Sequence, residues 1–303
     1  MTAPASALTI RGSIRERIIE RLLFLAAALG VFTTLGIITV LAIETFEFFL
    51  AVSPIDFFTG TRWSALIKPQ SWGVLALVSG TILVALIALV IAIPLGLLAA
   101  VLLSEYASVR LRTIVKPIIE TIAGVPTIVL GFFGLNVVAP QLRSILGPES
   151  IGTYSALAGG IVVGLLITPL IASISEDALR AVPRGLREGA FAMGATKFEV
   201  IRKVVFPAAI SGIMASIILA MSRAIGETMA VVLIVGTKPQ FTFDPTESVQ
   251  TMTAFIVQIS IGETAQGSVE YKSLFAVGAT LFAMTFALNL LSGWIVRRFR
   301  TAY

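Results

Sequence analysis

The segment WGVLALVSGTILVALIALVIAIPLGLLAAVLL, which runs from Trp72 to Leu103, decides the fold class of this chain. It contains no charged residue, and it is longer than the roughly 20 apolar residues that a helix needs to cross a hydrocarbon core about 30 Å thick. A helix longer than the core is thick must tilt, kink or extend beyond the lipid. The segment therefore predicts a long transmembrane helix with a kink at Pro94.

The composition of the whole chain extends this prediction. The 303 residues are 57% apolar and 13% charged, whereas soluble domains average about 25% charged residues. The absence of cysteine and histidine excludes disulfides, thiol catalysis and the commonest zinc and haem ligands. The net charge of +5 does not predict a nucleic-acid surface, because the basic residues are divided among separate loops. We therefore expect an all-α membrane protein without a metal site.

Six apolar segments predict six transmembrane helices. They cover Leu22–Ile43, Trp72–Leu103, Thr113–Val138, Tyr154–Ile174, Val204–Val235 and Leu274–Val296. Sixteen of the 22 lysines and arginines fall on the side of the N-terminus, five fall on the opposite side, and Arg223 lies within a helix. Because loops rich in Lys and Arg stay in the cytoplasm, both termini are expected there. The first apolar run is too long for a cleaved signal peptide, so we expect it to be retained.

The two outer loops, about 44–71 and 236–273, are long. The second loop is acidic, and its stretch Ser248–Ile261 is expected to form a short amphipathic helix. Two interpretations stay open for it: a solvated loop, or a surface for an external partner.

The cytoplasmic loop between the fourth and fifth helices reads PRGLREGAFAMGATKFEVIRKVVFP, from Pro183 to Pro207. Pro183 favours the first turn of a helix, and Gly194 is expected to end that helix. A second short helix follows before Pro207 opens the fifth transmembrane helix.

The first of these loop helices has a small apolar face, formed by Leu186, Ala190 and Met193 at helical spacing. One interpretation is a basic helix that lies on lipid headgroups. The other is a helix that docks in a groove of a partner protein. The second is favoured, because Gly189, Ala190 and Gly194 offer shallow relief instead of bulky membrane anchors.

The same loop resembles the coupling helix of ABC importer permeases of type I, which have a MetI-like fold. The family pattern is Glu-Ala-Ala, three residues, Gly, nine residues, Ile-x-Leu-Pro. The chain matches it with Glu188-Gly189-Ala190, then Gly194, then Val204-Val205-Phe206-Pro207. The resemblance implies that helices at about 184–203 insert into a cleft on a separate ATPase subunit, through Glu188, Gly189, Ala190, Gly194 and Pro207.

The chain has no Gly-x4-Gly-Lys-Ser/Thr phosphate loop. We therefore expect a transport subunit that is not an enzyme and holds no cofactor, with ATP used by the partner ATPase.

Two charged residues lie midway along the fifth predicted helix, Arg223 and Glu227. A spacing of four places both on one helix face, and such residues normally face the interior of a bundle or an aqueous path. One interpretation is a structural ion pair. The other is a guanidinium that binds an anion in transit, held in place by Glu227. The planar fork of arginine suits phosphate-like oxyanions, because it donates two parallel hydrogen bonds.

The third predicted helix holds further candidates. Gly124-Val125-Pro126 interrupts it, and irregular backbone at membrane depth is tolerated only where protein or water covers it. Thr127 is therefore a candidate hydrogen-bond donor in a substrate pathway. Glu120 lies one turn beyond Lys116, and a local salt bridge between them is expected.

Three segments resemble the permease subunits of phosphate-specific ABC transporters, PstC type. They are SRAIGETMAV (Ser222–Val231), LSEYA (Leu103–Ala107) and AGVPTIVLGFFGL (Ala123–Leu135). The resemblance implies a phosphate importer in the cell membrane of a prokaryote. The transmembrane permease domain is then 71–300, preceded at 1–70 by a tail, the first helix and an outer loop.

The partners implied are a second permease subunit (PstA type), forming a heterodimer, an ATPase dimer (PstB type) and an extracytoplasmic phosphate-binding protein (PstS type). Membrane lipid surrounds the assembly, and no nucleic acid is expected.

Other functions stay open. The chain could serve an ABC importer of a related oxyanion. An ion-coupled secondary anion transporter is less favoured, because it needs intramembrane carboxylates and usually internal repeats. A scaffold without transport leaves the buried charges Arg223 and Glu227 unexplained.

Overall fold

The structure, a computed structural model, describes residues 14–299. Arg11 and Arg300, which contribute to the predicted cytoplasmic charge, lie outside the described residues. Five of the described helices are long and apolar enough to cross a membrane, and a bent pair makes six when it is counted as one span. The all-α class and the number of spans predicted from the sequence are therefore confirmed.

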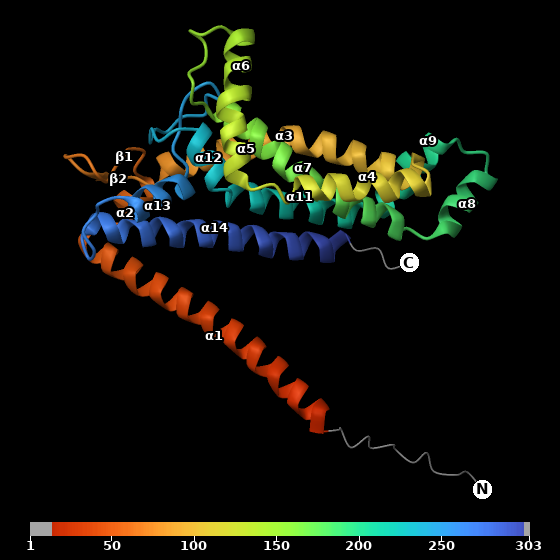
Figure 1. The fold of residues 1–303 in the computed structure, drawn as a ribbon, viewed down its shortest axis with the longest axis horizontal. Helices are drawn as coiled ribbons and strands as arrows, with labels where there is room; N and C mark the ends of the chain where they lie inside the picture. Colours follow the sequence, from red (N-terminus) through yellow and green to blue (C-terminus); the bar gives the residue numbers. More distant parts are fainter. Residues whose placement is uncertain (1–13, 300–303) are drawn as a thin grey trace.

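The long helices form a bundle that one of them leaves (Figure 1). They are α1 (Ile14–Ala51), α3 (Leu75–Val101), α7 (Ala156–Ala181), α11 (Ile210–Ile225) and α14 (Val269–Phe299).

Shorter helices and one strand pair complete the fold. They are α2 (Pro54–Thr59), α4 (Val109–Ile122), α5 (Thr127–Phe133), α6 (Ala139–Leu146), α8 (Arg184–Ala192), α9 (Lys197–Val200), α10 (Phe206–Ala208), α12 (Met229–Ile234), α13 (Met252–Ile261), β1 (Trp63–Ser64) and β2 (Ser71–Trp72). Three π-helical segments are present. η1 (Leu102–Tyr106) extends α3, whereas η2 (Gly134–Val138) joins α5 to α6 and η3 (Ile201–Val205) joins α9 to α10.

The centre of the bundle is the contact between α3 and α7. Two glycines on α7, Gly160 and Gly164, lie one helical turn apart and face α3. A β-carbon at Gly164 would lie 2.9 Å from the carbonyl oxygen of Ala88, so the two backbones approach too closely for any side chain. Gly96 of α3 provides the reciprocal close approach, because a β-carbon there would lie 2.7 Å from Ile171. Small residues at such spacing are typical of helix pairs in membranes, where backbone proximity replaces the hydrophobic effect as the source of stability.

The outer end of the molecule has its own aromatic core. Phe48 at the end of α1, Phe57 of α2 and Trp63 of β1 are buried there with Phe255 of α13. Trp63 pairs across the strands with Trp72, and edge-to-face ring contacts link the members of the group.

The helix predicted within Ser248–Ile261 is present as α13. Half of its residues are buried, including Met252 and Ile259, and it packs against α14 and α3. It is therefore part of the fold and not a solvated loop.

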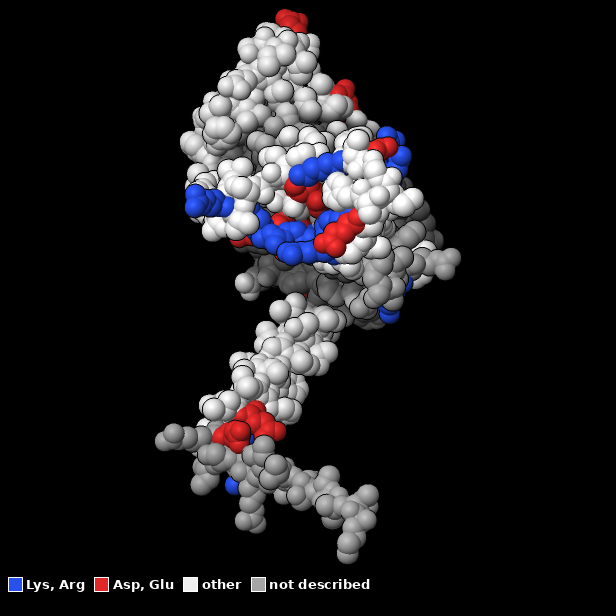
Figure 2. Space-filling view, turned by 90° about the vertical axis from the view of Figure 1, so that its right-hand side faces the viewer, with Lys and Arg blue, Asp and Glu red and all other residues white. Residues whose placement is uncertain are grey.

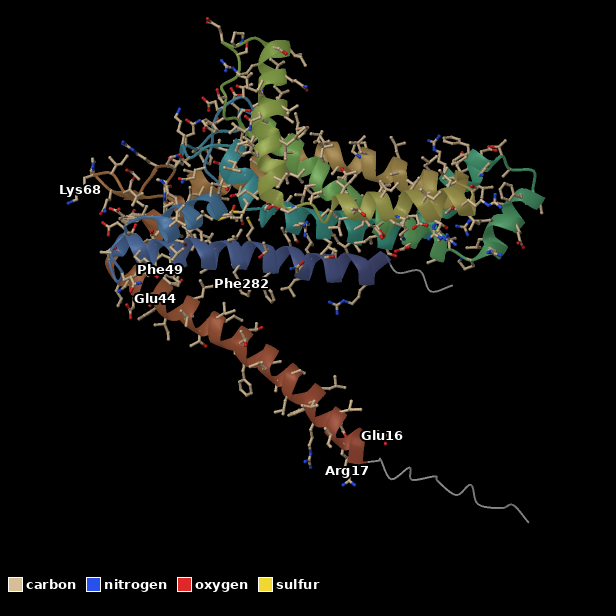
Figure 3. All side chains as sticks on the ribbon, viewed as in Figure 1. Glu16, Arg17, Glu44, Phe49, Lys68 and Phe282 are labelled. Atoms are coloured by element: carbon tan, nitrogen blue, oxygen red, sulfur yellow. The ribbon has the colours of Figure 1, made fainter. Side chains whose placement is uncertain are left out.

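Helix α1 leaves the bundle. It contacts α14 near its C-terminal end, where Lys272 forms an ion pair with Glu47. Toward its N-terminal end it diverges from the other helices, and its side chains there point into open space (Figure 3). Glu16 and Arg17 mark that far end. From their contact near α2, α1 and α14 both run toward the side on which α8 lies, which agrees with termini on one side of the membrane (Figure 1).

Two predicted transmembrane helices are interrupted in the structure. The interruption predicted at Gly124-Val125-Pro126 is confirmed, whereas the prediction of a continuous helix over Val204–Val235 is wrong. The predicted helix Thr113–Val138 is broken between Ile122 and Thr127, where Gly124 and Pro126 cannot maintain the helical ladder. Its first part, α4, lies alongside α7, while α5 and α6 run in a different direction (Figure 1). The membrane-spanning stretch is Thr127–Leu146, and it ends later than predicted.

The predicted helix Val204–Val235 is also interrupted. It bends by 69° at Ala209, between the pieces Lys197–Ala208 and Ile210–Ile225. A second break separates α11 from α12 at Gly226–Thr228.

The α3–α7 contact yields a stability prediction. Gly164→Ala is expected to lower the thermal unfolding midpoint of the detergent-solubilised protein, because its methyl group collides with the backbone of Ala88. Overpacking of this kind destabilises by about 1–3 kcal/mol. The matched control is Gly278→Ala, whose methyl group meets Leu41 at an ordinary 3.4 Å and gains about 1 kcal/mol of helix propensity. A Gly164→Ala midpoint at or above that of the control contradicts the prediction.

Candidate functional site

The cytoplasmic end of the molecule carries the segment predicted to dock a partner. Helix α8 begins directly after Pro183, as predicted. Gly194 follows the helix with φ of +81°, a left-handed conformation that glycine adopts without strain. Helix α9 then starts with a capping box, in which Thr196 and Glu199 satisfy each other's backbone donors. The local sequence thus sets a helix–turn–helix corner.

The apolar residues of this corner are divided between two surfaces. Ala190 packs inward against a cluster that includes Val200 and Val205. Met193 and Phe198 point outward and are 88% and 62% exposed. The predicted single face of Leu186, Ala190 and Met193 is therefore wrong, because Ala190 belongs to the core side. The outward apolar side chains leave a surface suited to burial against another molecule.

Arg187 fixes the corner to the end of α7. Its guanidinium donates hydrogen bonds of 2.7 Å to the carbonyl oxygens of Leu179 and Val182 at the C-terminal end of α7. It also forms an ion pair of 3.0 Å with Glu105 in η1. Next to Glu105, the ring of Tyr106 lies 4.5 Å below the ammonium group of Lys197 in α9. The η1 segment therefore holds both α8 and α9.

Sequence reasoning placed Arg187 only on the polar face of its helix and assigned no role to Glu105. The sole signal was the LSEYA segment, noted as a resemblance. Glu105 and Arg187 are 82 residues apart, and local periodicity gives no information about such a pair.

A buried carboxylate, that of Glu176, lies on α7 shortly before the C-terminal end of this helix. Glu176 of α7 has a side chain that is 0% exposed, and it lies 2.7 Å from both Arg112 and Lys116 of α4. Glu120 accepts a hydrogen bond from Ser173 of α7 instead of pairing with Lys116. The predicted local bridge between Glu120 and Lys116 is therefore wrong, and the charges of α4 bind α7.

The predicted substrate residues Arg223 and Glu227 are separated by the break between α11 and α12. Glu227 is buried, at 7% exposure, and accepts a weak hydrogen bond of 3.4 Å from the amide of Ala230 at the start of α12. Arg223 is exposed, and among the described residues no ion pair or hydrogen bond involves it. The predicted common helix face is therefore wrong, because Gly226 ends the helix between the two residues, and the structural ion pair of the first interpretation is absent among the described residues.

The third candidate, Thr127, is the first residue of α5 and comes directly after the break at Gly124-Val125-Pro126. Helix α5 packs against α12. A β-carbon at Gly131 would lie 3.0 Å from the α-carbon of Ala230, so glycine permits this contact. The two interrupted helices thus meet, and Thr127 and Glu227 each flank one of the breaks.

Comparison with known proteins identifies the family. The sequence profile of the binding-protein-dependent transport system inner membrane component matches residues 92–301. The chain belongs to this family of ABC transporter permeases. It is accordingly a multi-pass protein of the cell membrane and a transport component, not an enzyme.

Two relatives illustrate the range of the permease family. The chain is 36% identical to the probable ABC transporter permease protein YqgH of Bacillus subtilis, over 92% of this chain and 90% of that protein. It is 31% identical to the phosphate transport system permease protein PstC of Mesorhizobium japonicum, over 85% of this chain and 80% of that protein.

Solved structures agree with the fold. A permease of a bacterial alginate ABC transporter, solved with an alginate-bound periplasmic protein, aligns with a TM-score of 0.64 and 16% identity, over 95% of this chain and 99% of that one. The inward-facing MetNI methionine transporter aligns with a TM-score of 0.56 and 22% identity, over 78% of this chain and 100% of that one. At these identities the likeness concerns the fold, and it confirms the predicted MetI-like architecture of the permease.

The corner held by Arg187 generates a prediction. Arg187→Gln is expected to speed hydrogen exchange of the α8 amides by about tenfold or more, because hydrogen bonds to charged groups contribute about 1.5–3 kcal/mol. Exchange is measured by mass spectrometry on peptides that cover α8. The matched control is Arg202→Gln, which removes an exposed arginine of the same segment that has no ion pair among the described residues. Equal exchange in both variants counts against the anchoring role.

Proposed function

We propose that the chain is the permease subunit of an ATP-driven importer of inorganic phosphate and forms half of its translocation pathway. Relatives named as phosphate permeases support the substrate, since they match over four-fifths of this chain. The segments SRAIGETMAV, LSEYA and AGVPTIVLGFFGL, which carry the resemblance, occur where the structure places the helix break, the anchor of the docking corner and the α5–α12 contact.

The observation that carries the proposal is the unpaired guanidinium of Arg223. An arginine at mid-membrane costs about 2.5–3.5 kcal/mol on insertion scales, so it is not left facing lipid. Within this chain it is exposed, and no described carboxylate neutralises it. We infer that a second permease subunit and water cover it, and that Arg223 lies at the boundary between the two halves of the pathway. All five N–H donors remain free for an oxyanion.

Glu227 then acts through the backbone. Its buried carboxylate faces the first turn of α12, and its carbonyl oxygen accepts a hydrogen bond of 2.9 Å from Thr253 of α13. The helix break beside Arg223 is thereby tied to the outer helix. Thr127 is a candidate donor on the neighbouring break.

The partners follow from the surfaces. The outward side chains of α8 and α9 are the docking surface for an ATPase dimer (PstB type), with Glu188, Gly189, Ala190, Gly194 and Pro207 in the coupling segment. The long α1, which lacks packing partners over much of its length, is covered by the second permease (PstA type) and by lipid. A phosphate-binding protein (PstS type) delivers phosphate to the outer end. ATP binds the ATPase and not this chain.

A substitution tests the role of Arg223. Arg223→Gln is expected to reduce phosphate uptake by about tenfold or more, because the charge-assisted donors are lost, and Arg223→Lys should retain part of it. Uptake of radiolabelled phosphate is measured in proteoliposomes that contain the complete importer. Arg110→Gln serves as the control, since Arg110 is exposed, has no ion pair among the described residues and lies outside both the proposed pathway and the coupling segment. Full uptake by Arg223→Gln would sink the assignment of this residue.

Energy coupling and competing substrates test the proposal more broadly. Uptake should require ATP and the ATPase subunit, and uptake that continues without ATP would point to an ion-coupled secondary transporter. The name of the relative with 36% identity specifies no substrate. Sulfate and molybdate should therefore be compared with phosphate, and preference for either would indicate an importer of a related oxyanion.

A further inference from the structure

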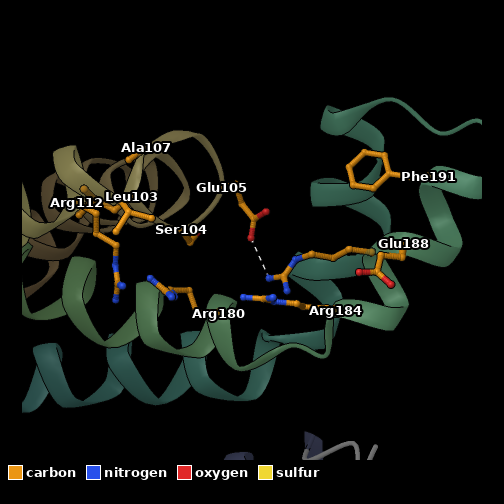
Figure 4. A pocket seen from close by; sticks show the side chains of 11 residues that line it. Leu103, Ser104, Glu105, Ala107, Arg112, Arg180, Arg184, Glu188 and Phe191 are labelled. Carbon is orange, nitrogen blue, oxygen red and sulfur yellow. Dashed lines mark hydrogen bonds and ion pairs between the residues drawn. The ribbon is translucent and has the colours of Figure 1, made fainter.

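A second basic feature lies outside the proposed pathway, at the cytoplasmic end. An open cleft of about 480 Å³ separates η1 and the start of α4 from the end of α7 and α8. Four arginines line it: Arg112, Arg180, Arg184 and Arg187. Figure 2 views this end and shows blue side chains gathered around a hollow, with some red ones among them. Figure 4 shows the side chains of Arg112, Arg180 and Arg184 directed into the space beneath Ser104 and Glu105.

The carboxylates nearby do not neutralise these arginines. Glu105 is engaged by Arg187 at 3.0 Å. Glu176 lies 2.7 Å from Arg112 and 2.7 Å from Lys116. Its distance to Arg180 is longer, at 3.8 Å. Lys116 also pairs with Asp177 at 2.7 Å, so three cations, Arg112, Lys116 and Arg180, share the two carboxylates of Glu176 and Asp177.

Arg184 is the least compensated member of the group. Among the described residues it has no ion pair and no hydrogen bond, although Glu188 of the same helix also lines the cleft. The buried Nε of Arg187 likewise has no hydrogen-bond partner within the described structure. The lining therefore keeps a surplus of forked donors at fixed positions, because the Glu105 and Glu176 contacts order two of the four arginines.

We infer that this cleft is a binding site for a phosphate-type oxyanion on the cytoplasmic side. Guanidinium forks match the geometry of phosphate oxygens and remain charged at every physiological pH. The same chemistry is offered by free inorganic phosphate and by the headgroup of an anionic phospholipid. The site goes beyond the proposed function, and only the choice of inorganic phosphate as the probe rests on it.

Because the site lies beside the docking corner, anion binding there would affect the contact between this chain and the ATPase. An anion held between Arg180 of α7, Arg184 of α8 and Arg112 of α4 bridges three elements that meet at the docking corner. Its binding stabilises one arrangement of that corner relative to others. Free phosphate that accumulates inside the cell would then bias the importer through the surface that contacts the ATPase.

The absence of native cysteine permits a direct test. Ser104→Cys introduces a single thiol of nearly the same size into the cleft lining, and Ala107→Cys provides a second reporter from the same wall. The complete importer is assembled in nanodiscs of neutral phosphatidylcholine, and the rate of labelling by N-ethylmaleimide is measured. Potassium phosphate is compared with potassium chloride at equal ionic strength.

Phosphate is expected to slow labelling in proportion to 1 + [phosphate]/Kd. Adding Arg184→Gln should raise the phosphate concentration for half-protection by about tenfold, whereas Arg202→Gln should leave it unchanged. If nanodiscs containing phosphatidylglycerol protect the thiol without added phosphate, the occupant is a lipid headgroup. Protection by neither source, protection that survives Arg184→Gln, or a thiol that the reagent never reaches because the ATPase fills the cleft would each overturn the inference.

This readout is independent of uptake. A protein that fails to import phosphate but still shows Arg184-dependent protection would refute the proposed function and keep the cytoplasmic site. A protein that imports phosphate without protection would do the reverse.

Discussion

The close contact of α3 with α7 is the constraint on which the rest of the structure depends. Gly160 and Gly164 let the backbones approach until no side chain fits between them. In lipid this proximity supplies the van der Waals contact that holds helices together. The pair forms the frame on which the other elements are arranged, because α7 continues at its cytoplasmic end into Glu176 and the α7–α8 corner. Any movement of that corner therefore takes place relative to α7, which is held tightly against α3.

The docking corner is attached more firmly to α7 than to α11. Arg187 closes the end of α7 and reaches Glu105, and the charges of α4 converge on the buried Glu176. Toward α11, by contrast, the chain passes through the π-helical η3 and a bend of 69° at Ala209. A continuous helix from Pro207 to Arg223 would transmit displacement along its axis. The bent connection instead lets the corner and α11, which carries Arg223, change their relative angle.

The sequence predicted the features that depend on local chemistry. Pro183, Gly194 and the regular apolar runs determined the docking corner and the spans, because helix starts, left-handed turns and hydropathy are read from neighbouring residues. It predicted the interruption at Gly124-Val125-Pro126 but not the break at Gly226–Thr228, where the apolar character of the sequence continues. The Arg223–Glu227 pair was wrong for the same reason: equal helix faces require a continuous helix. Glu105 and Glu176 were missed because their partners lie 60 or more residues away.

The helix breaks at Gly124–Pro126 and Gly226–Thr228 meet the same physical requirement. Free backbone groups at membrane depth persist only where protein or water satisfies them. Helices α5 and α12, each following one break, pack against each other through Gly131. Thr253 of the buried α13 donates its hydroxyl to the carbonyl oxygen of Glu227, which the break leaves without a helical partner. Helix α13 thus supplies a hydrogen-bond donor to the interrupted helix, and displacement of α13 would leave the carbonyl oxygen of Glu227 without that donor. Under the proposed function, this loop from the outer face would line the pathway, and a partner docking there would act on the break without touching it.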